Sequence, residues 1–169
     1  MRDTFTPLLQ FFIATGEVTG RKKCQKMIHI LQECGHDFGF DFKLALYGAY
    51  SSALQSELET FVENNYIKES TTYSDTLKYP TSHFVPNKRS ASILTILGES
   101  GEPEWSDLAR KLNKRPTREL EATSTILYLR RAGILEEHLE SKFKALKPHL
   151  MDIYSEGFKL AEELKLTVA

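Results

Sequence analysis

The sequence predicts a mainly α protein, with a winged-helix-like N-terminal part that carries a β-hairpin wing and an all-α C-terminal part. Apolar residues recur at helical spacing through most of the chain. Between two such stretches, residues 66–73 and 79–85 are rich in β-branched and aromatic types and flank a turn, as expected of a hairpin. We expect a winged-helix-like domain over residues 1–87 and a helical domain over residues 88–169 packed against it.

The composition is that of a folded globular chain. Its 169 residues suffice for one sizeable core or two small ones, and 41% are hydrophobic. With 22 basic and 23 acidic residues the net charge is −1, so any contact with nucleic acid needs local charge segregation. Two cysteines are few for a secreted chain, and no apolar run is long enough for a membrane span or a signal sequence. We therefore expect a cytoplasmic protein without a membrane partner.

Apolar spacing predicts the first two helices. A short opening helix has Pro7 in its first turn and ends near Gly16. A second helix over residues 21–34 places its apolar side chains along one stripe. Cys24 and Cys34 lie ten residues apart on this helix, about 15 Å, which is too far for a disulfide. We expect both to be packed free thiols.

The next two segments complete the winged-helix order. Residues 36–50 alternate large apolar side chains with other types, which favours an extended segment. A helix over residues 51–65, capped by serine, then occupies the usual position of the helix that enters DNA. It carries Glu57, Glu59 and Glu63 and neither Lys nor Arg, which argues against insertion into the major groove.

The C-terminal half is predicted to be helical, with charges that are segregated along it. The expected helices lie around 93–97, over 105–112, from 117 onward, over 135–146 and over 150–164. Residues 105–131 contain seven basic and three acidic residues, whereas the chain from residue 136 contains seven acidic residues and five lysines. The two ends of this half therefore differ in charge.

Two basic patches are candidate contacts for a protein or nucleic-acid partner. They consist of Arg21, Lys22, Lys23 and Lys26, and of Arg110, Lys111, Lys114, Arg115 and Arg118. The second patch resembles a helix-turn-helix, whose basic residues contact phosphates. A helical hairpin with a solvated basic face is slightly favoured, because Glu119 and Glu121 would repel DNA where the helix should enter the groove. A continuous positive face joining the patches would favour nucleic acid.

The sequence offers no catalytic, metal or cofactor motif. The five histidines lack metal-ligand spacing, and there is no GxSxG, GxGxxG or P-loop. We expect His29 and His149 to be partly buried, while His83 on the second wing strand is placed to face a partner. The aromatic stretch 38–50 is more typical of a core than of a ligand pocket. An enzyme is the least favoured class.

Two motifs, GRKKCQKMIHILQ (20–32) and YGAYSSALQSELETFVENNYIKE (47–69), resemble those of the bacterial YwgA-like family. The order of elements is similar, more distantly, to the Panacea-domain antitoxins, including SocA-type proteolysis adaptors. The positions that match are Gly20, Arg21, Gln25, Lys26, Tyr47, Gly48 and Ser51. Cys24, His29 and Ala49 stand where the family usually has Leu, Tyr and Pro.

The resemblance implies a winged-helix-like fold without enzymatic activity, and the antitoxins act by protein contact. It also implies a buried or partner-facing role for Arg21 and Gln25. We therefore expect a non-enzymatic regulatory or antitoxin-like protein that acts by protein–protein contact. A winged-helix transcriptional regulator that binds DNA is the alternative, and a homodimer is compatible with either.

Overall fold

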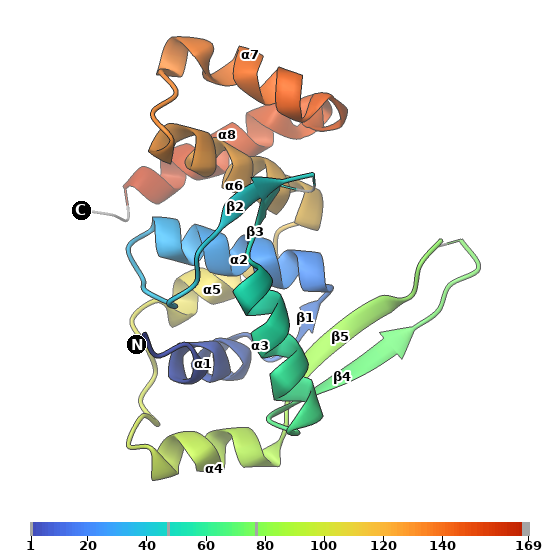
Figure 1. Ribbon diagram of the computed structural model, residues 1–169, viewed down its shortest axis with the longest axis vertical. Coiled ribbons are helices and arrows are strands. Elements are labelled where there is room, and N and C mark those ends of the chain that lie inside the picture. Colours follow the sequence, from blue (N-terminus) through green and yellow to red (C-terminus); the bar gives the residue numbers. More distant parts are fainter. Residues whose placement is uncertain (1, 47, 77, 167–169) are drawn as a thin grey trace.

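The computed structural model describes residues 2–46, 48–76 and 78–166. In these ranges the chain forms eight α-helices, one 3-10 helix and five short strands, so the protein is mainly α, as predicted (Figure 1). The helices are α1 (Phe5–Thr15), α2 (Arg21–Glu33), α3 (Ser52–Glu63), α4 (Lys88–Ile96), α5 (Ser106–Asn113), α6 (Thr117–Arg131), α7 (Glu136–Leu146), η1 (Pro148–Ile153) and α8 (Tyr154–Lys165). The strands are β1 (Val18–Thr19), β2 (Lys43–Ala45), β3 (Gly48–Tyr50), β4 (Ile67–Thr72) and β5 (Thr81–Pro86).

Polar side chains set the starts of α3 and α4. The hydroxyl of Ser51 accepts a hydrogen bond from the backbone N–H of Leu54 at 3.2 Å, which confirms the predicted serine cap. Asn87 and Ser90 form a reciprocal capping box at the start of α4. The Ser90 hydroxyl also donates to the carbonyl of Tyr66 at 2.6 Å, so this cap ties α4 to the chain that enters β4.

The predicted hairpin over residues 66–85 is confirmed as β4 and β5, which pair antiparallel from Ile67–Pro86 to Thr72–Thr81. The sheet order is β1-β5-β4, and β1 pairs with β5 only through Val18 and Thr19. Beyond these pairs the hairpin continues as a two-stranded ribbon that leaves the body of the molecule (Figure 1). The helix, strand and hairpin order agrees with the sequence analysis, and the winged-helix comparison stays a prediction.

The expected extended stretch 36–50 is a strand only near its end, where β2 and β3 form a separate hairpin with Leu44 opposite Ala49. Residues 36–42 are a loop. The reason lies in Gln32, whose side-chain amide donates to the carbonyl of Phe40 at 2.8 Å while its oxygen accepts the Phe40 N–H at 3.0 Å. These bonds occupy the backbone groups that a ladder partner would need.

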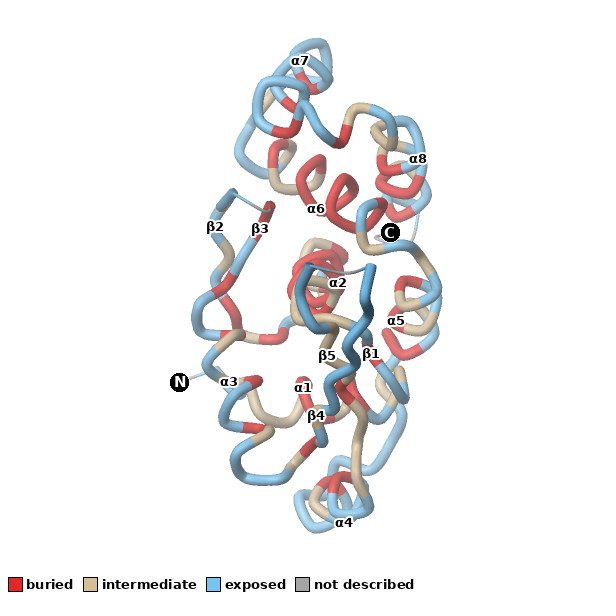
Figure 2. The backbone as a smooth tube through the Cα atoms, turned by 90° about the vertical axis from the view of Figure 1, so that its right-hand side faces the viewer, coloured by how far each residue is buried: buried red, intermediate tan, exposed pale blue. Residues whose placement is uncertain are grey.

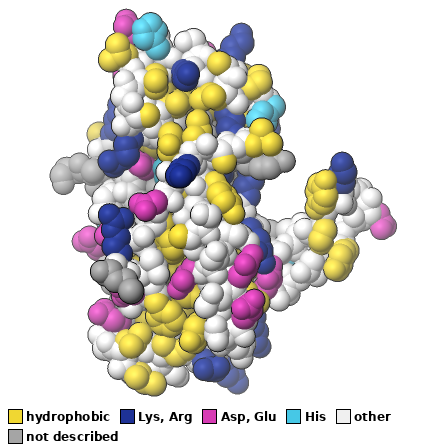
Figure 3. Space-filling view, viewed as in Figure 1, with side chains coloured by type: hydrophobic (Ala, Val, Ile, Leu, Met, Phe, Trp, Pro, Cys, Tyr) yellow, Lys and Arg dark blue, Asp and Glu magenta, His cyan; other side chains and the backbone are white. Residues whose placement is uncertain are grey.

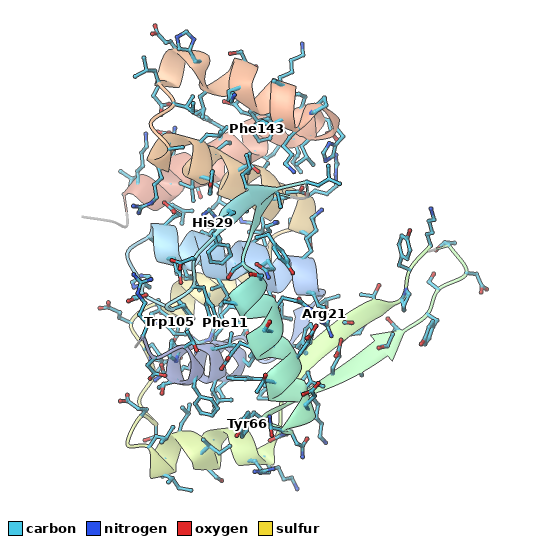
Figure 4. All side chains as sticks on the ribbon, viewed as in Figure 1. Phe11, Arg21, His29, Tyr66, Trp105 and Phe143 are labelled. Carbon is cyan, nitrogen blue, oxygen red and sulfur yellow. The ribbon has the colours of Figure 1, made fainter. Side chains whose placement is uncertain are left out.

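Two apolar clusters form the core. The larger cluster gathers residues from α1 to α5 and adds Leu120 of α6 and Leu160 and Leu164 of α8. Within it, Trp105 packs on Phe38 with ring centroids 4.9 Å apart (Figure 4). The smaller cluster lies between α6, α7, η1 and α8. Residues on both sides of position 87 contribute to the larger cluster, and the predicted two-domain division stays a prediction.

Helix α6 lies at the centre of the C-terminal half and is buried along most of its length (Figure 2). It contacts α2 on one side and α7, η1 and α8 on the others. The last helix begins at Tyr154 and not at Leu150, because Pro148 opens a 3-10 segment first. Within the described ranges, no helix combines the length and apolar character that crossing a membrane requires.

Candidate functional site

The two sequence motifs meet at one joint between α2 and the segment that enters α3. The side-chain amide of Gln25 donates to the carbonyl of Ser51, and its oxygen accepts the Ser51 N–H, both at 2.9 Å. From the next residue of α2, the Lys26 ammonium donates to the carbonyl of Ala49 at 2.7 Å. Gln25 is therefore buried, in agreement with the role that the resemblance implies. Tyr47, the remaining motif position here, lies outside the described residues.

Behind this joint, Lys22, Lys26 and Lys147 gather around Glu121, and we call these four residues the lysine cluster. Lys22 contacts a carboxylate oxygen of Glu121 at 2.6 Å, and the ammonium of Lys147 lies 3.6 Å from the other oxygen. Lys147 also donates to the carbonyl of Leu46. Lys26, Lys147 and Glu121 are each about 1% exposed. Buried ammonium groups thus hold the β2–β3 hairpin against α2 and α6.

The lysine cluster packs closely against Gly48. A Cβ atom built there would lie 3.1 Å from the Lys26 ammonium and 3.5 Å from Cγ of Glu121, and Gly48 has φ of +94°. The positive φ favours glycine at this position of β3, and a Cβ there would force the Lys26 ammonium to shift by a few tenths of an ångström. The four side chains therefore pack under the hairpin and hold it against α2 and α6.

Burial lowers the pKa of Lys26 to about 8, from an ordinary value of 10.5, and Glu121 only partly opposes this effect. Burial also lowers the pKa of Lys147. Between pH 8 and 10.5 the unfolded chain binds more protons at Lys26 than the folded protein does, so this residue makes stability rise with pH across that window.

We expect Lys26→Met to remove this dependence. The wild-type free energy of unfolding should rise, relative to that of Lys26→Met, by roughly 1–3 kcal/mol between pH 8 and 10.5. Urea unfolding at several pH values measures it, and the comparison cancels the titration of groups that both proteins share. Parallel curves for the two proteins would show that Lys26 keeps an ordinary pKa in the folded state.

The first predicted basic patch is distributed between the interior and the surface. Arg21 lies 3.2 Å from Glu69 of β4 and 3.5 Å from Glu59 of α3 (Figure 4). Lys23 donates to the carbonyl of Asn113 at the end of α5, at 2.5 Å. Lys22 and Lys26 belong to the lysine cluster, and Lys26 is buried. Arg21 therefore binds α3 to β4, and Lys26 does not reach the surface that a partner would contact.

The second basic patch is largely paired with carboxylates of this chain. Arg110 contacts Glu102 and Asp107. Arg115 contacts Glu119 and Glu163. The two terminal nitrogens of Arg118 donate to the two carboxylate oxygens of Asp152. Lys111 and Lys114 are exposed. The bond from Lys23 to Asn113 brings the two patches next to each other, but the arginines on that surface already have acidic partners.

The helical hairpin of α5 and α6 keeps two acidic residues in the interior. Glu119 and Glu121 do not face the solvent: they are 7% and 1% exposed and pair with Arg115 and with the lysine cluster. The helix that would enter a DNA groove, α6, is instead surrounded by other helices. Sequence reasoning therefore identified α5 and α6 correctly and misplaced the face that α6 exposes.

The β4–β5 hairpin carries the most exposed part of the described chain, residues 70–76 and 78–82, which we call the arm. Tyr73 and Tyr79 near its tip are 82% and 71% exposed. In Figure 3 the arm stands clear of the body, with hydrophobic side chains along it and a basic one at its tip. Its charged residues are Asp75 and Lys78, so the net charge is zero.

His83 lies at the base of the arm and binds within the chain. Its two ring nitrogens lie 3.3 Å from the hydroxyl of Thr19 in β1 and 2.9 Å from the hydroxyl of Thr72 in β4. Glu17 approaches the same ring at 3.2 Å. The position predicted to face a partner therefore joins all three strands where the arm leaves the body.

His29, in contrast, is almost fully buried where α2 meets α6 (Figure 4). Its Nδ1 lies 2.7 Å from the hydroxyl of Ser124, and its Nε2 lies 3.5 Å from Glu33. A serine, a histidine and a glutamate are thus linked side chain to side chain, but Ser124 is fully buried and is not among the residues that line the cavity beside His29. His149, which was expected to be partly buried, is exposed because it lies on the outer side of η1.

A cavity of about 350 Å³ opens beside His29, and we call it the α2–α6 cavity. It is lined by the end of α2, by residues 40–42 and by the end of α6. Phe40 and Phe42 belong to the aromatic stretch that was predicted to be core. Phe40 is indeed buried, and both rings also form the cavity wall. Among the described residues, no group of three or more His, Cys, Asp and Glu could hold a metal ion.

Comparison with known proteins supplies one informative match. No protein-family model matches the chain. The uncharacterized protein YwgA of Bacillus subtilis (strain 168) is 27% identical over 165 residues, which cover 94% of each chain. The more distant likeness to Panacea-domain antitoxins stays a prediction. The match along nearly the whole length supports the resemblance that the two motifs indicate: the chain is similar to this protein over 94% of its length.

Proposed function

We propose that this protein is a non-enzymatic regulatory protein that acts by contact with another protein, and that the arm is its contact element. The observation that carries this proposal is the projection of the arm with two exposed tyrosines near its tip (Figure 1). A two-stranded ribbon is marginally stable in water, so its own contacts do not account for its length. Tyrosine is enriched in protein interfaces, where it combines apolar area with a hydrogen-bonding group.

Charge favours a protein over DNA as the partner. The arm has no net charge, and α3 beside its base carries three glutamates without a lysine or arginine. Duplex DNA is bound largely through neutralised phosphates, which requires several free cations on the contacting surface. The arm and α3 do not provide them. A partner with a basic surface that accepts aromatic side chains is the better complement.

The arm can be tested by site-specific cross-linking in cells. A photoreactive phenylalanine analogue at position 79 should give one discrete cross-linked protein. The same analogue at Ile96, which is 83% exposed on α4, serves as the control position and should not give that product. Labelling of the same set of proteins from both positions would contradict a contact role for the arm.

Substitution of the two tyrosines gives a second, quantitative prediction. Tyr73→Ser combined with Tyr79→Ser should weaken capture of the cross-linked partner at least about tenfold, because exposed aromatic anchors dominate such interfaces. Both side chains are exposed, so the free energy of unfolding should change by less than about 0.5 kcal/mol. Unchanged capture by a normally folded variant would refute the proposal.

DNA binding is tested on the same samples by fluorescence anisotropy with duplex DNA. If the alternative function holds, affinity should fall steeply between low and physiological salt. Arg115→Glu with Arg118→Glu should then weaken the binding further. Salt-dependent binding of this kind, together with no partner cross-linked from the arm, would replace protein contact by DNA binding as the function.

A further inference from the structure

We propose that the α2–α6 cavity is a binding site for a small organic cation, with a quaternary ammonium group as its best match. The cavity lies on the body of the molecule and is lined by residues outside the arm, so this inference does not depend on the proposed contact function. Its volume of about 350 Å³ is at the lower end of the range for small-molecule sites.

Electrostatics select a cation. The cavity is bounded by the last residues of two helices, α2 at Glu33 and α6 at Arg131. The aligned peptide dipoles place a partial negative charge at each helix C-terminus, and backbone N–H groups of residues 34–36 and 132–134 bind carbonyl groups there. Glu33 is paired with Arg131, so Asp41 is the carboxylate that leaves the described lining with a net charge of −1. An anion in the same place would face two helix ends and this net negative charge.

Arg131 is the basic residue among those that line the cavity in the described chain, and it forms an ion pair with Glu33. Its Nε lies 2.9 and 2.8 Å from the two oxygens of Glu33. The Arg131 side chain is 68% exposed, so it lies at the rim and faces the solvent. Asp41 also lines the cavity. Its side chain is 94% exposed, and its carboxylate lies 3.6 Å from Arg2.

The walls supply aromatic faces that suit an alkylated ammonium. Phe40, Phe42 and Tyr128 line the cavity, and the rings of Phe42 and Tyr128 lie 4.9 and 6.1 Å from the His29 ring. Aromatic faces attract cations that approach within about 6 Å. The bond from His29 to Ser124 fixes the imidazole, so these rings are held in place before a ligand arrives. Aromatic rings together with carboxylates are the composition that recognises quaternary ammonium groups.

The direct test compares choline with 3,3-dimethylbutan-1-ol, its neutral carbon analogue, by two-dimensional NMR titration of the labelled full chain. Choline should shift the backbone signals of residues 40–42 and of the end of α6, and should bind at least about fivefold more tightly than the neutral analogue. Equal binding of both compounds would overturn the inference, since shape alone would then explain it. Absence of shifts at the cavity with choline and with the larger benzyltrimethylammonium would overturn it as well.

Substitutions in the cavity wall test which residues bind choline. Asp41→Asn removes an exposed charge, and Phe42→Leu removes an aromatic face; each should weaken choline binding at least about threefold. Glu137→Gln, an exposed carboxylate on α7, is the matched control and should leave binding unchanged. The variant with Tyr73→Ser and Tyr79→Ser should also bind choline normally. If Glu137→Gln weakened choline binding as much as Asp41→Asn does, the binding would reflect only a general attraction of cations to the protein. Tighter binding of benzoate than of choline would assign the cavity to anions.

Discussion

Replacing Glu121 by leucine is expected to lower the free energy of unfolding by about 3–5 kcal/mol, because it leaves buried ammonium groups without their carboxylate. In the folded protein Lys26 and Lys147 are about 1% exposed and lie beside this carboxylate. Removal of one partner of a buried ion pair costs far more than loss of a surface pair. Urea unfolding of the two proteins, monitored by circular dichroism at neutral pH, measures the difference.

Two further variants separate this effect from a simple change of volume. Glu137→Leu removes a carboxylate that is 72% exposed on α7 and should change stability by less than about 0.5 kcal/mol. Adding Lys26→Met to Glu121→Leu removes one of the stranded charges and should restore part of the loss. If Glu121→Leu were as stable as the wild type, the ammonium groups would not depend on Glu121, and the lysine cluster would not fasten the hairpin.

The second large effect is expected at Gly157, where α8 crosses α6. A Cβ atom at Gly157 would lie 2.6 Å from Cβ of Ala122 and 3.1 Å from the backbone nitrogen of Thr123. Neither atom can rotate away, so Gly157→Ala must push the helices apart. We expect a loss of about 1–3 kcal/mol, although alanine is better than glycine in a helix by about 1 kcal/mol. Thermal unfolding followed by circular dichroism measures this loss.

A matched substitution and a compensating one identify the cause. Gly101→Ala adds the same methyl group where no atom lies within 4 Å, and it should be neutral or slightly stabilising. Ala122→Gly combined with Gly157→Ala returns the space on the opposite helix and should recover part of the loss. A Gly157→Ala protein that unfolds at the wild-type temperature would show that α6 and α8 do not approach this closely.

Local patterns predicted the elements because each depends on residues close in sequence. The hairpin required two β-branched stretches around a turn, and the cap at Ser51 required only the residues that follow it. The stretch 36–50 was less well predicted because its loop is fixed by Gln32, which lies outside it. Sequence spacing does not reveal which side chain will take the backbone hydrogen bonds of a segment.

The candidate sites depended on contacts that no local pattern contains. Glu121 and Lys147 were missed because α6 is packed on several sides and has no single apolar stripe, so its acidic residues were assigned to the solvent. His29 was expected to be partly buried, but its bond to Ser124 joins residues 95 positions apart. Helical spacing reveals only ion pairs between residues three or four apart, such as Arg115 with Glu119 and Arg110 with Asp107.

The larger apolar cluster joins Leu8 in the first helix to Leu160 and Leu164 in the last. During synthesis the N-terminal helices leave the ribosome first, while α8 is still to be translated. The nascent chain therefore carries an incomplete apolar surface until α8 has been translated. Emergence of α8, and not the emergence of the N-terminal half, is the step that closes this surface.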